Sequence, residues 1–413
     1  MLSDSLGYDW NRAHLLHREF VPRVVDETLR DGLQSPSAHD PPLDRKLELL
    51  HLMAGLGIDC AALGYPAARK RQWDDVLALA SELSRARLGI SACCAARALE
   101  QDIAPIADIS QRAGLPLQVG LFVASSPLRR HTERWNLEDL QRRTECAVSF
   151  AVRHGLDVMY VAEDSTRASP DVLEALYRTA IRCGATRVCV ADTAGHATPR
   201  GAAAVVRFVR ELLDRLNPSA QLDWHGHRDR GLDLANSLAA WDAGAERCHG
   251  TALGIGERCG NTPIELLLLS LVLDGRRTHD LTLLPRYAER AAAALGVSIP
   301  PNHPVVGRDA FRTGTGTHAA ALVKGERLGT RSDRIDSGVP SRLIGRRPII
   351  EIGPLSGNWN VIGWLAERGL PEDPALVQKI LDAAKASDRV LEETEIWALV
   401  RRYEGPRDSA HSA

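Results

Sequence analysis

The sequence carries little net charge and no long hydrophobic run. Its 51 basic and 53 acidic side chains leave a formal net charge of −2. No strong positive field is therefore available for a phosphate backbone, and we expect no nucleic acid partner. The longest apolar run, Ile264–Leu273, contains Glu265 and reaches only about half the length that a bilayer requires. We predict a buried helix there and no membrane partner.

Export signals and paired-cysteine motifs are missing as well. Residues 1–20 contain no basic stretch followed by an apolar core and a cleavage site, so we expect a cytoplasmic protein. None of the eight cysteines forms a C-x-x-C pair, which favours reduced, mostly buried thiols over a disulfide or zinc framework. No G-x-G-x-x-G motif opens the first helix, so dinucleotide binding has no support.

Short apolar segments alternate with stretches of helical periodicity. Eight segments are strand-like, at residues 21–29, 60–66, 88–94, 117–125, 157–164, 187–193, 221–227 and 246–254. Helix-period stretches separate them, for example at residues 43–57, 170–184, 200–216 and 231–244. The strand–loop–helix unit therefore repeats roughly every 30 residues, which is the pattern of parallel βαβ units.

We predict an α/β fold: a (β/α)8 TIM barrel over residues 1–278, followed by a smaller, mainly helical C-terminal appendage. Eight units in about 250 residues match a closed barrel, and an open doubly wound sheet is the competing fold. The barrel is favoured because ionisable residues gather at the C-terminal ends of several strands. We assign residues 279–340 to a linker subdomain with a Gly-Thr-Gly-Thr-His segment, and residues 341–413 to a helical subdomain with a polar tail. Residues 374–403 have helical periodicity.

His225 and His227 end the seventh strand-like segment. Residues two apart in an extended strand point to the same side, so both imidazoles can face one point above the barrel mouth. An isolated pair of this kind is more often satisfied by neighbouring groups. Asp31, just beyond the first strand, favours a metal site instead, because the first and seventh strands lie close together around a closed barrel. Two neutral imidazoles and a carboxylate suit a divalent cation with open coordination positions.

Two further segments carry polar groups with alternative interpretations. Arg30, beside Asp31, could stabilise an oxyanion on a bound substrate, whereas an Arg-Asp dipeptide alone is usually a surface ion pair. The loop at residues 254–261 contains three glycines that permit tight turns, and its Glu257 and Asn261 offer oxygen ligands or hydrogen bonds. Taken alone, this loop is generic.

Acidic and hydroxyl groups end the fifth and sixth strand-like segments. Glu163, Asp164 and Ser165 follow the fifth segment, and Thr193 follows the sixth. A hydroxyl such as that of Thr193 can bind a carboxylate without neutralising a metal. Asp and Ser after a strand commonly cap the next helix, and capping is the role that we predict for Asp164 and Ser165.

Five ordered motifs link these positions along the chain. They are DETLRDGLQ, AEDSTR, ADTAGHATP, HGHRDRGLDLANSLAAWDAGAERCHGTALGIGERCGNTPIE and GRDAFRTGTGTHAAALVK. In this order they resemble the DRE-TIM metallolyase superfamily and, within it, the Claisen-condensing acyltransferases: 2-isopropylmalate, homocitrate and citramalate synthases. The similarity covers residues 21–325 and extends weakly to residue 365.

The resemblance implies a divalent cation, Mn²⁺, Mg²⁺ or Zn²⁺, as cofactor. Its ligands would be Asp31, His225 and His227, and Asn261 would lie close to the metal. The resemblance also implies that Arg30 stabilises an enolate or alkoxide.

Other positions gain roles through the same resemblance. Thr193 would contact the carboxylate of a 2-oxo acid, and Gln34 and Met159 are expected to bind substrate as well. Glu163 would be a polar group of the active site. His318, in a segment that matches a family motif, would come from the appendage and assist proton transfer in a partner subunit. The resemblance therefore implies a homodimer with a cross-subunit active site.

The implied reaction joins acetyl-CoA, the co-substrate, to a 2-oxo acid. A methyl proton leaves acetyl-CoA, the enolate adds to the 2-oxo carbonyl, and thioester hydrolysis gives a 2-alkylmalate and CoA. Met159 stands where homocitrate synthases tend to have Arg, and Met159 and Leu33 could line an apolar pocket. We therefore favour activity like that of 2-isopropylmalate synthase, with an aliphatic or other apolar oxo acid.

Departures from the family pattern leave other functions open. Arg228 follows the histidine pair where Asn is common, Ala62 replaces a usual Glu, and Asp336 stands near an expected Tyr. These changes leave an inactive regulatory scaffold as one alternative, and homocitrate or citramalate synthase activity is another. A retro-Claisen lyase like hydroxymethylglutaryl-CoA lyase is a third, although residues 254–261 lack the Gly-Gly-Cys-Pro of those lyases.

Overall fold

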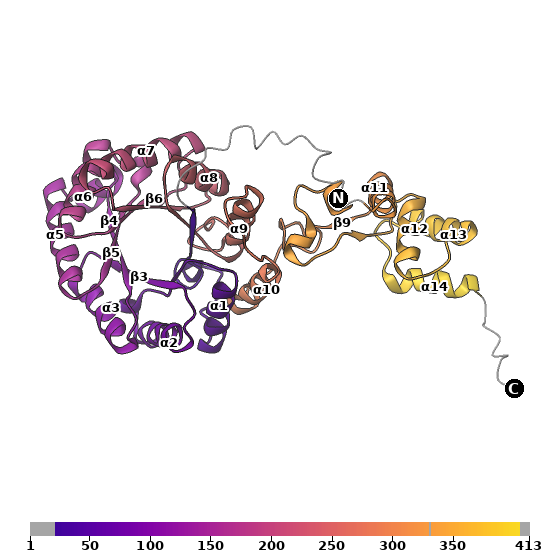
Figure 1. The fold of residues 1–413 in the computed structure, drawn as a ribbon, viewed down its shortest axis with the longest axis horizontal. Helices are drawn as coiled ribbons and strands as arrows, with labels where there is room; N and C mark the ends of the chain where they lie inside the picture. Colours follow the sequence, from indigo (N-terminus) through magenta and orange to yellow (C-terminus); the bar gives the residue numbers. More distant parts are fainter. Residues whose placement is uncertain (1–20, 330–331, 405–413) are drawn as a thin grey trace. The chain divides into compact units, whose positions relative to one another are not determined.

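The computed structural model describes residues 21–329 and 332–404. Its first part is a closed barrel of eight parallel strands in chain order, in which β8 is hydrogen-bonded back to β1. Figure 1 shows these strands as an inner ring with the helices arranged around it. The predicted (β/α)8 barrel is confirmed.

The barrel strands lie at the eight segments predicted from the sequence. They are β1 (Arg23–Asp26), β2 (Cys60–Ala62), β3 (Ser91–Arg97), β4 (Gln118–Ala124), β5 (Asp157–Glu163), β6 (Arg187–Asp192), β7 (Gln221–Gly226) and β8 (Arg247–Gly250). The helices of this part are α1 (Leu43–Gly55), α2 (Lys70–Ala86), α3 (Glu100–Ala113), α4 (Pro127–Glu133), α5 (Leu137–Arg153), α6 (Pro170–Arg182), α7 (Pro199–Leu216), α8 (Asp233–Ala243), α9 (Ile264–Leu273) and α10 (Leu284–Leu295).

Strands and helices follow the burial that a parallel barrel imposes. Every residue of β6 is buried, because helices cover its outer face and other strands its inner face. On α7, Val206, Val209 and Leu213 recur at helical spacing and are buried, which packs one side of the helix against the sheet. The side chain of Thr198 caps this helix by accepting a 3.2 Å hydrogen bond from the Gly201 backbone N–H, as N-cap threonines do.

The strand register brings the carboxyl ends of distant segments to one rim. Asp26 of β1 lies opposite Gly250 of β8, and Trp224 of β7 lies opposite Cys248 of β8. Because all the strands run in parallel, the loops that follow β1, β7 and β8 meet at the same end of the barrel. The fold thus places residues from both ends of the barrel sequence around one site.

The apolar run of the sequence forms α9, a buried helix as predicted. Glu265 on this helix is fully buried, and burial raises its pKa to about 7. Its Oε2 accepts a 3.1 Å hydrogen bond from the Leu253 backbone N–H. A carboxyl with a pKa near neutral pH is thereby built into the apolar shell of the barrel.

A second compact unit begins at Pro300. We predicted boundaries after residues 278 and 340, and the structure places the division between those positions. Helix α10 belongs to the barrel unit because its Tyr287 hydroxyl donates a hydrogen bond to the buried carboxylate of Asp26 on β1. The change in sequence rhythm after residue 278 therefore precedes the structural division by one helix.

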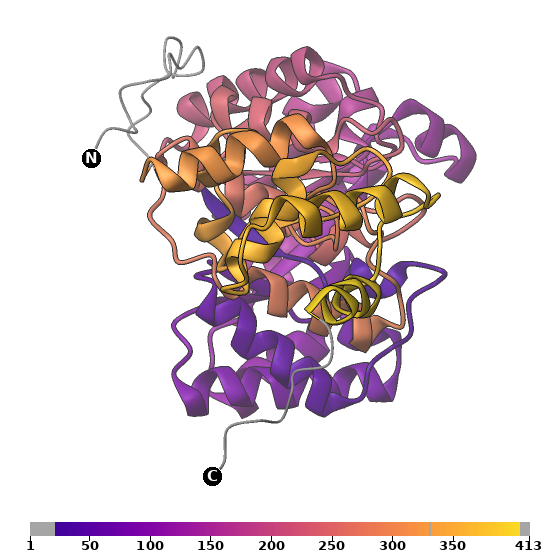
Figure 2. The same cartoon turned by 90° about the vertical axis from the view of Figure 1, so that its right-hand side faces the viewer.

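The C-terminal unit is mainly helical, as predicted. Its elements are β9 (Arg312–Thr313), α11 (Gly316–Arg327), β10 (Ile349–Ile350), α12 (Asn358–Glu367), α13 (Pro374–Lys385) and α14 (Glu393–Glu404), coloured orange to yellow in Figure 2. Strands β9 and β10 pair in parallel. Residues 374–403 form two helices, α13 and α14, because the chain turns at Ser387, whose hydroxyl donates to the Arg389 carbonyl and accepts from the Arg389 backbone N–H.

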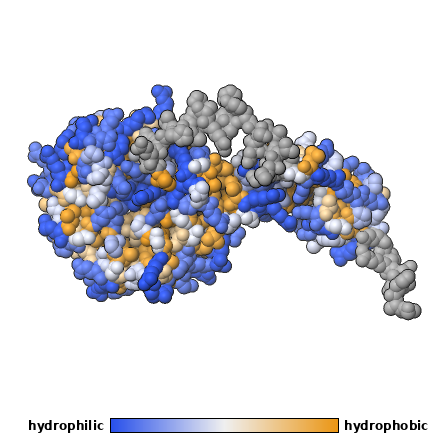
Figure 3. Space-filling view, in the orientation of Figure 1, coloured by the Kyte–Doolittle hydropathy of each residue, from blue (hydrophilic) through white to orange (hydrophobic). Residues whose placement is uncertain are grey.

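Apolar and polar residues are mixed on the faces that Figure 3 shows. Hydrophobic residues are interspersed with hydrophilic ones on both units. None of the described helices is long and apolar enough to cross a bilayer. The predicted polar tail at 405–413 and residues 1–20, on which the expectation about export depended, lie outside the described residues.

The cysteines are free thiols, and most are buried, as predicted. All eight lie in the described residues and none is in a disulfide. The buried ones are Cys60, Cys93, Cys94, Cys189 and Cys248. Because these five lie on β2, β3, β6 and β8, they fill the barrel wall as small apolar side chains.

Candidate active site and metal centre

The three residues predicted to hold a metal converge at the C-terminal rim of the barrel. Asp31 follows β1, His225 lies on β7, and His227 comes just after it. The Nε2 atoms of His225 and His227 lie 3.4 Å and 3.7 Å from Oδ2 of Asp31. One ligand atom from each residue lies within 4.8 Å of the other two. The structure therefore brings all three side chains to one point.

Buried polar atoms without partners show that this point fits a divalent cation. Among the described residues, Nδ1 of His225, Nδ1 of His227 and both amide atoms of Asn261 are buried without a hydrogen-bond partner. A Cβ on Gly256 would lie 2.1 Å from Nδ2 of Asn261 and 2.8 Å from Oδ1 of Asp31, so a glycine is needed where these side chains meet. Imidazole, carboxylate and amide groups are suitable ligands for Mn²⁺, Mg²⁺ or Zn²⁺.

The protonation states of these groups also suit a cation. Burial, together with the neighbouring His225, lowers the pKa of His227 to about 4, so its ring is neutral at pH 7. Burial opposes ionisation of Asp31, but Arg30 and the two histidines hold its pKa well below the usual range. An imidazole and a carboxylate that are already deprotonated, as at His227 and Asp31, bind a metal without first losing protons.

Arg30 is fixed between two carboxylates beside the cluster. Its Nε donates a 2.7 Å hydrogen bond to Oε2 of Glu27, and its Nη1 donates a 3.1 Å hydrogen bond to Oδ2 of Asp31. The side chain is 17% exposed and lines the same pocket as His225. A guanidinium held in this way can stabilise negative charge on a ligand without reorganising.

A cavity of about 360 Å³ opens beside the cluster. Asp31, His225, His227 and Arg30 form part of its lining. Apolar and sulfur-bearing side chains from β3, β4, β5 and β6 form another part: Cys93, Cys94, Phe122, Met159, Val161, Cys189 and Ala191. The cavity therefore suits a small ligand that has both an anionic end and a hydrocarbon part.

Four other predicted site residues line this cavity: Gln34, Met159, Glu163 and Thr193. Thr193 Oγ1 accepts a 2.8 Å hydrogen bond from the Asp164 backbone N–H, which leaves its hydroxyl proton for another acceptor. Burial raises the pKa of Glu163, which favours a protonated carboxyl. Leu33 is not among the residues that line this cavity, so its place in an apolar pocket stays a prediction.

The capping role predicted for Asp164 and Ser165 is wrong. Asp164 precedes a short 3-10 turn, but its carboxylate accepts hydrogen bonds from the Arg167 guanidinium and caps no backbone N–H. The Ser165 hydroxyl donates to the Ala162 carbonyl and accepts a 3.1 Å hydrogen bond from the Ala191 backbone N–H. Ser165 therefore links β5 to β6 behind the pocket.

His318 lies in the C-terminal unit, in the first turn of α11. It is exposed and lines a smaller cavity of about 130 Å³ within that unit. Arg312, Asp333 and Asp336 share this lining, so Asp336, which stands near the expected tyrosine, lies beside the same cavity as His318. The cross-subunit role of His318 and the homodimer stay predictions.

A column of charged residues inside the barrel was not predicted from the sequence. His249 on β8 has its ring nitrogens 2.9 Å from Oε1 of Glu27 and 3.0 Å from Oδ2 of Asp223. Arg247 donates a 2.9 Å hydrogen bond to the same Asp223 oxygen. One signal was present: polar residues stand two apart on β7, at Asp223 and His225, and on β8, at Arg247 and His249, which is the spacing of side chains on one face.

Comparison with known proteins assigns the family. Residues 21–288 match the family model described as HMGL-like. The chain belongs to the HMGL-like family. This HMGL-like chain is 33% identical to homocitrate synthase AksA of Methanopyrus kandleri, with 94% of the chain and 95% of that protein covered. It is 31% identical to the "Probable 2-isopropylmalate synthase" of Ignicoccus hospitalis, with 88% and 86% covered.

A solved structure supports the same fold. The crystal structure of hydroxymethylglutaryl-CoA lyase from Pseudomonas aeruginosa matches the HMGL-like chain with a TM-score of 0.56 at 22% identity, and covers 67% of this chain and 95% of that one. At this identity the match shows the fold alone. The resemblance to the DRE-TIM superfamily is confirmed, and the similar synthases belong to its Claisen-condensing branch.

Proposed function

We propose that this HMGL-like chain is an acyltransferase that condenses acetyl-CoA with an apolar 2-oxo acid, in the manner of a 2-isopropylmalate synthase. One observation carries the proposal: the Asp31, His225 and His227 cluster and Arg30 border the same cavity as an apolar wall. The synthases among its relatives support a condensation. The products would be a 2-alkylmalate and CoA.

The metal cluster and Thr193 would bind the carboxylate and carbonyl oxygens of the oxo acid. Asp31, His225 and His227 would bind the divalent cation, with Asn261 beside it. When bound, the cation supplies Lewis acidity toward a 2-oxo carbonyl. The Thr193 hydroxyl would donate its proton to the substrate carboxylate, since its oxygen already accepts a backbone hydrogen bond. These groups together orient the carbonyl carbon for attack.

Arg30 and two proton carriers would serve carbon–carbon bond formation. One proton carrier would accept a methyl proton from acetyl-CoA, the enolate carbon would add to the 2-oxo carbonyl carbon, and the other carrier would protonate the resulting alkoxide oxygen. The Arg30 guanidinium stabilises the negative charge on the oxygen that this step creates. Glu163, whose pKa burial raises, and His318, which would serve the partner subunit's site in a homodimer, are the proposed proton carriers. Water then hydrolyses the thioester, so acetyl-CoA, oxo acid and water become 2-alkylmalate and CoA.

The cavity wall would select the side chain of the oxo acid. Phe122, Met159 and Val161 present apolar atoms there, and burying a second carboxylate against such atoms without a partner costs free energy. An aliphatic or other apolar side chain therefore fits best. Homocitrate synthase activity is the second candidate, because the HMGL-like chain is 33% identical to AksA over nearly its whole length.

Release of CoA tests the proposal. The purified protein is stripped with EDTA, reloaded with Mn²⁺, Mg²⁺ or Zn²⁺, and incubated with acetyl-CoA and one of a panel of 2-oxo acids, and free thiol is then measured. We expect thiol release only when a 2-oxo acid and a cation are both present, and fastest release with branched aliphatic acids. Fastest release with 2-oxoglutarate would favour the homocitrate candidate instead. Cleavage of a 3-hydroxyacyl-CoA to acetyl-CoA without thiol release, or no reaction in any mixture, would contradict a condensing enzyme.

A further inference from the structure

Glu27 and His249 lie inside the barrel, where Glu27 contacts both Arg30 and His249. The side chains of Glu27, His249 and Asp223 are almost fully buried. Oε2 of Glu27 accepts the 2.7 Å hydrogen bond from Arg30, and Oε1 lies 2.9 Å from Nδ1 of His249. The other ring nitrogen of His249 lies 3.0 Å from Asp223. We call Asp223, His249 and Glu27 the buried column.

The environment of the buried column favours alternating charges. Burial opposes ionisation of Glu27, but Arg30 and His249 hold its pKa far below the usual range. Burial also opposes protonation of His249, but hydrogen bonds to Asp223 and Glu27 raise its pKa. Asp223 is held ionised by Arg247 and Arg187 against its own burial. Each charge therefore has an opposite neighbour, and loss of one partner would leave a buried charge uncompensated.

Glu27, His225 and His249 could also be considered as a second metal site, because one ligand atom of each lies within 4.8 Å of the others. The contacts argue against it. Both nitrogens of His249 face carboxylates, and both oxygens of Glu27 already have partners, one of them the Arg30 guanidinium. A cation there would have to displace the His249–Glu27 hydrogen bond beside a fixed positive charge.

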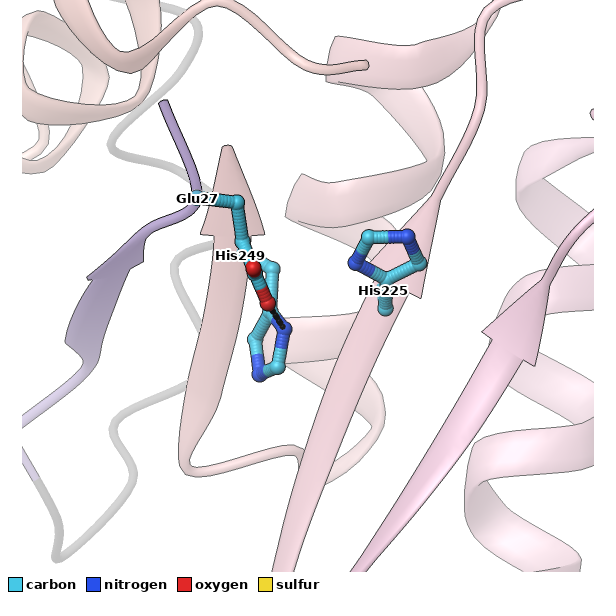
Figure 4. A group of neighbouring side chains, drawn as sticks. All are labelled: Glu27, His225 and His249. Carbon is cyan, nitrogen blue, oxygen red and sulfur yellow. Dashed lines mark hydrogen bonds and ion pairs between the residues drawn. The ribbon is translucent and has the colours of Figure 1, made fainter. Parts of the chain in front are cut away.

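His225 supplies the connection to the metal cluster. Figure 4 shows its ring turning one edge toward Glu27 and His249. Nδ1 of His225 is buried and has no hydrogen-bond partner among the described residues. A histidine that ligates a metal through Nε2 carries its proton on Nδ1, and a nearby carboxylate commonly accepts that proton and fixes the ring. Glu27 is placed to be this carboxylate.

We propose that Glu27 is a positioning residue that holds Arg30 and orients His225, and that His249, anchored on Asp223, fixes Glu27 in place. The proposal rests on the proposed function, which gives Arg30 and His225 their roles. Without the Glu27 carboxylate, Asp31 is the one hydrogen-bond partner that Arg30 keeps among residues 21–329 and 332–404, and its guanidinium then competes with the cation for that oxygen. Both cation affinity and turnover should suffer.

Mn²⁺ titration and steady-state kinetics of Glu27→Gln test this directly. We expect wild type to bind one Mn²⁺ at this cluster, and we expect Glu27→Gln to weaken that binding by roughly 10–100-fold. The variant should lower kcat by a similar factor while KM for the oxo acid changes by less than about threefold, because the substitution disturbs groups that act in the transition state. Cys248→Ala, a buried neighbour on β8 that bonds to Ser237 instead, is the matched control and should behave like wild type.

Two further variants separate a positioning role from a merely structural one. His249→Gln keeps one amide donor for Glu27 and should show the same two losses at smaller size, which also covers the case in which Glu27→Gln fails to fold. In an Arg30→Ala background, Glu27→Gln should lower kcat by a smaller factor than it does in wild type, because only its effect through His225 then remains.

Several results would overturn the proposal. The first is a loss of kcat in the Arg30→Ala/Glu27→Gln double variant that equals the product of the two single losses. The second is unchanged Mn²⁺ affinity and kcat in Glu27→Gln. The third is a second Mn²⁺ per chain that Glu27→Gln removes, since Glu27 would then be a ligand. Failure of the proposed function looks different: wild type itself would release no CoA with any oxo acid. In that case the Mn²⁺ titrations still decide whether Glu27 orients His225.

Discussion

Replacement of Glu265 by Gln should change how the stability of the barrel depends on pH. Glu265 is fully buried on α9, and burial raises its pKa to about 7. Its Oε2 accepts a 3.1 Å hydrogen bond from the Leu253 backbone N–H, which a glutamine oxygen can retain. The substitution therefore removes an ionisable group while it preserves volume and this hydrogen bond.

The direction of the stability change with pH depends on the proton that Glu265 keeps in the folded chain. Unfolding lets Glu265 titrate at its ordinary pKa of 4.5. The stability that comes from burying the protonated carboxyl is fully present below pH 4.5 and is lost as pH rises to about 7, because the unfolded chain then releases its proton more readily. The interval between 4.5 and about 7 corresponds to about 3 kcal/mol. A glutamine at this position loses none of that free energy.

Urea unfolding at pH 5 and pH 8, followed by tryptophan fluorescence, measures the effect. Trp224 and Trp241 are both fully buried in the barrel unit and report its unfolding. Between the two pH values, the free energy of unfolding of Glu265→Gln should improve relative to wild type by about 2–3 kcal/mol. Asp26, whose pKa burial raises to about 6, titrates in both proteins, and its repulsion of Glu265 is only a minor cause of the raised Glu265 pKa.

Glu211→Gln is the control for the Glu265 experiment. Glu211 is exposed on α7, so its replacement should shift stability equally at both pH values. If Glu265→Gln and wild type instead show parallel pH profiles, Glu265 ionises as easily in the folded chain as in the unfolded one, and the reasoning from its burial fails.

Two further predictions concern the cavity. His227→Ala removes a ligand atom from the cluster, and because a catalytic cation contributes several kcal/mol, CoA release should fall at least about 100-fold and Mn²⁺ binding should be lost by titration; His51→Ala, which changes an exposed histidine on α1, should leave both unchanged. In Gly120→Ala the new Cβ would lie 3.1 Å from Cε of Met159 and make the cavity narrower at its apolar wall. The ratio of kcat/KM for a branched oxo acid to that for pyruvate should then fall roughly 10–100-fold, the range for about one methylene, and an unchanged ratio would show that the side chain binds elsewhere.

The barrel and the metal cluster could be predicted because short-range patterns determine them. Eight apolar segments at regular spacing indicate a closed parallel sheet whatever their individual side chains are. The two-residue spacing of His225 and His227 puts both rings on one face of β7. Asp31 could be added because closure of the barrel makes the first strand a neighbour of the last ones.

The roles of Asp164 and Glu27 could not be predicted, since each depends on a neighbour that is not visible in the local sequence. Asp164 adopts a left-handed backbone conformation with φ of 61°, which directs its carboxylate to Arg167 rather than to a helix N-terminus. Glu27 stands in a motif beside Arg30, but its second partner, His249, is more than two hundred residues away in the chain. A residue pattern gives the face of a strand, whereas the partner across the barrel depends on how far each side chain reaches.

One face of β7 carries a structural residue, Asp223, and a predicted metal ligand, His225. The two differ in how deep they lie in the barrel. Asp223, deepest in the column, is fully buried and its charge is compensated by Arg187, Arg247 and His249. At the rim, His225 and His227 each keep a buried ring nitrogen without a partner in the described chain. An unsatisfied buried polar atom costs about 1–3 kcal/mol, a cost that the proposed hydrogen bond from Nδ1 of His225 to Glu27 would offset at one of these rings. The same two-residue spacing on β7 thus places Asp223, whose charge is compensated, in the interior of the barrel. At the mouth it places His225 and His227, whose Nε2 atoms face Asp31 in the predicted metal site.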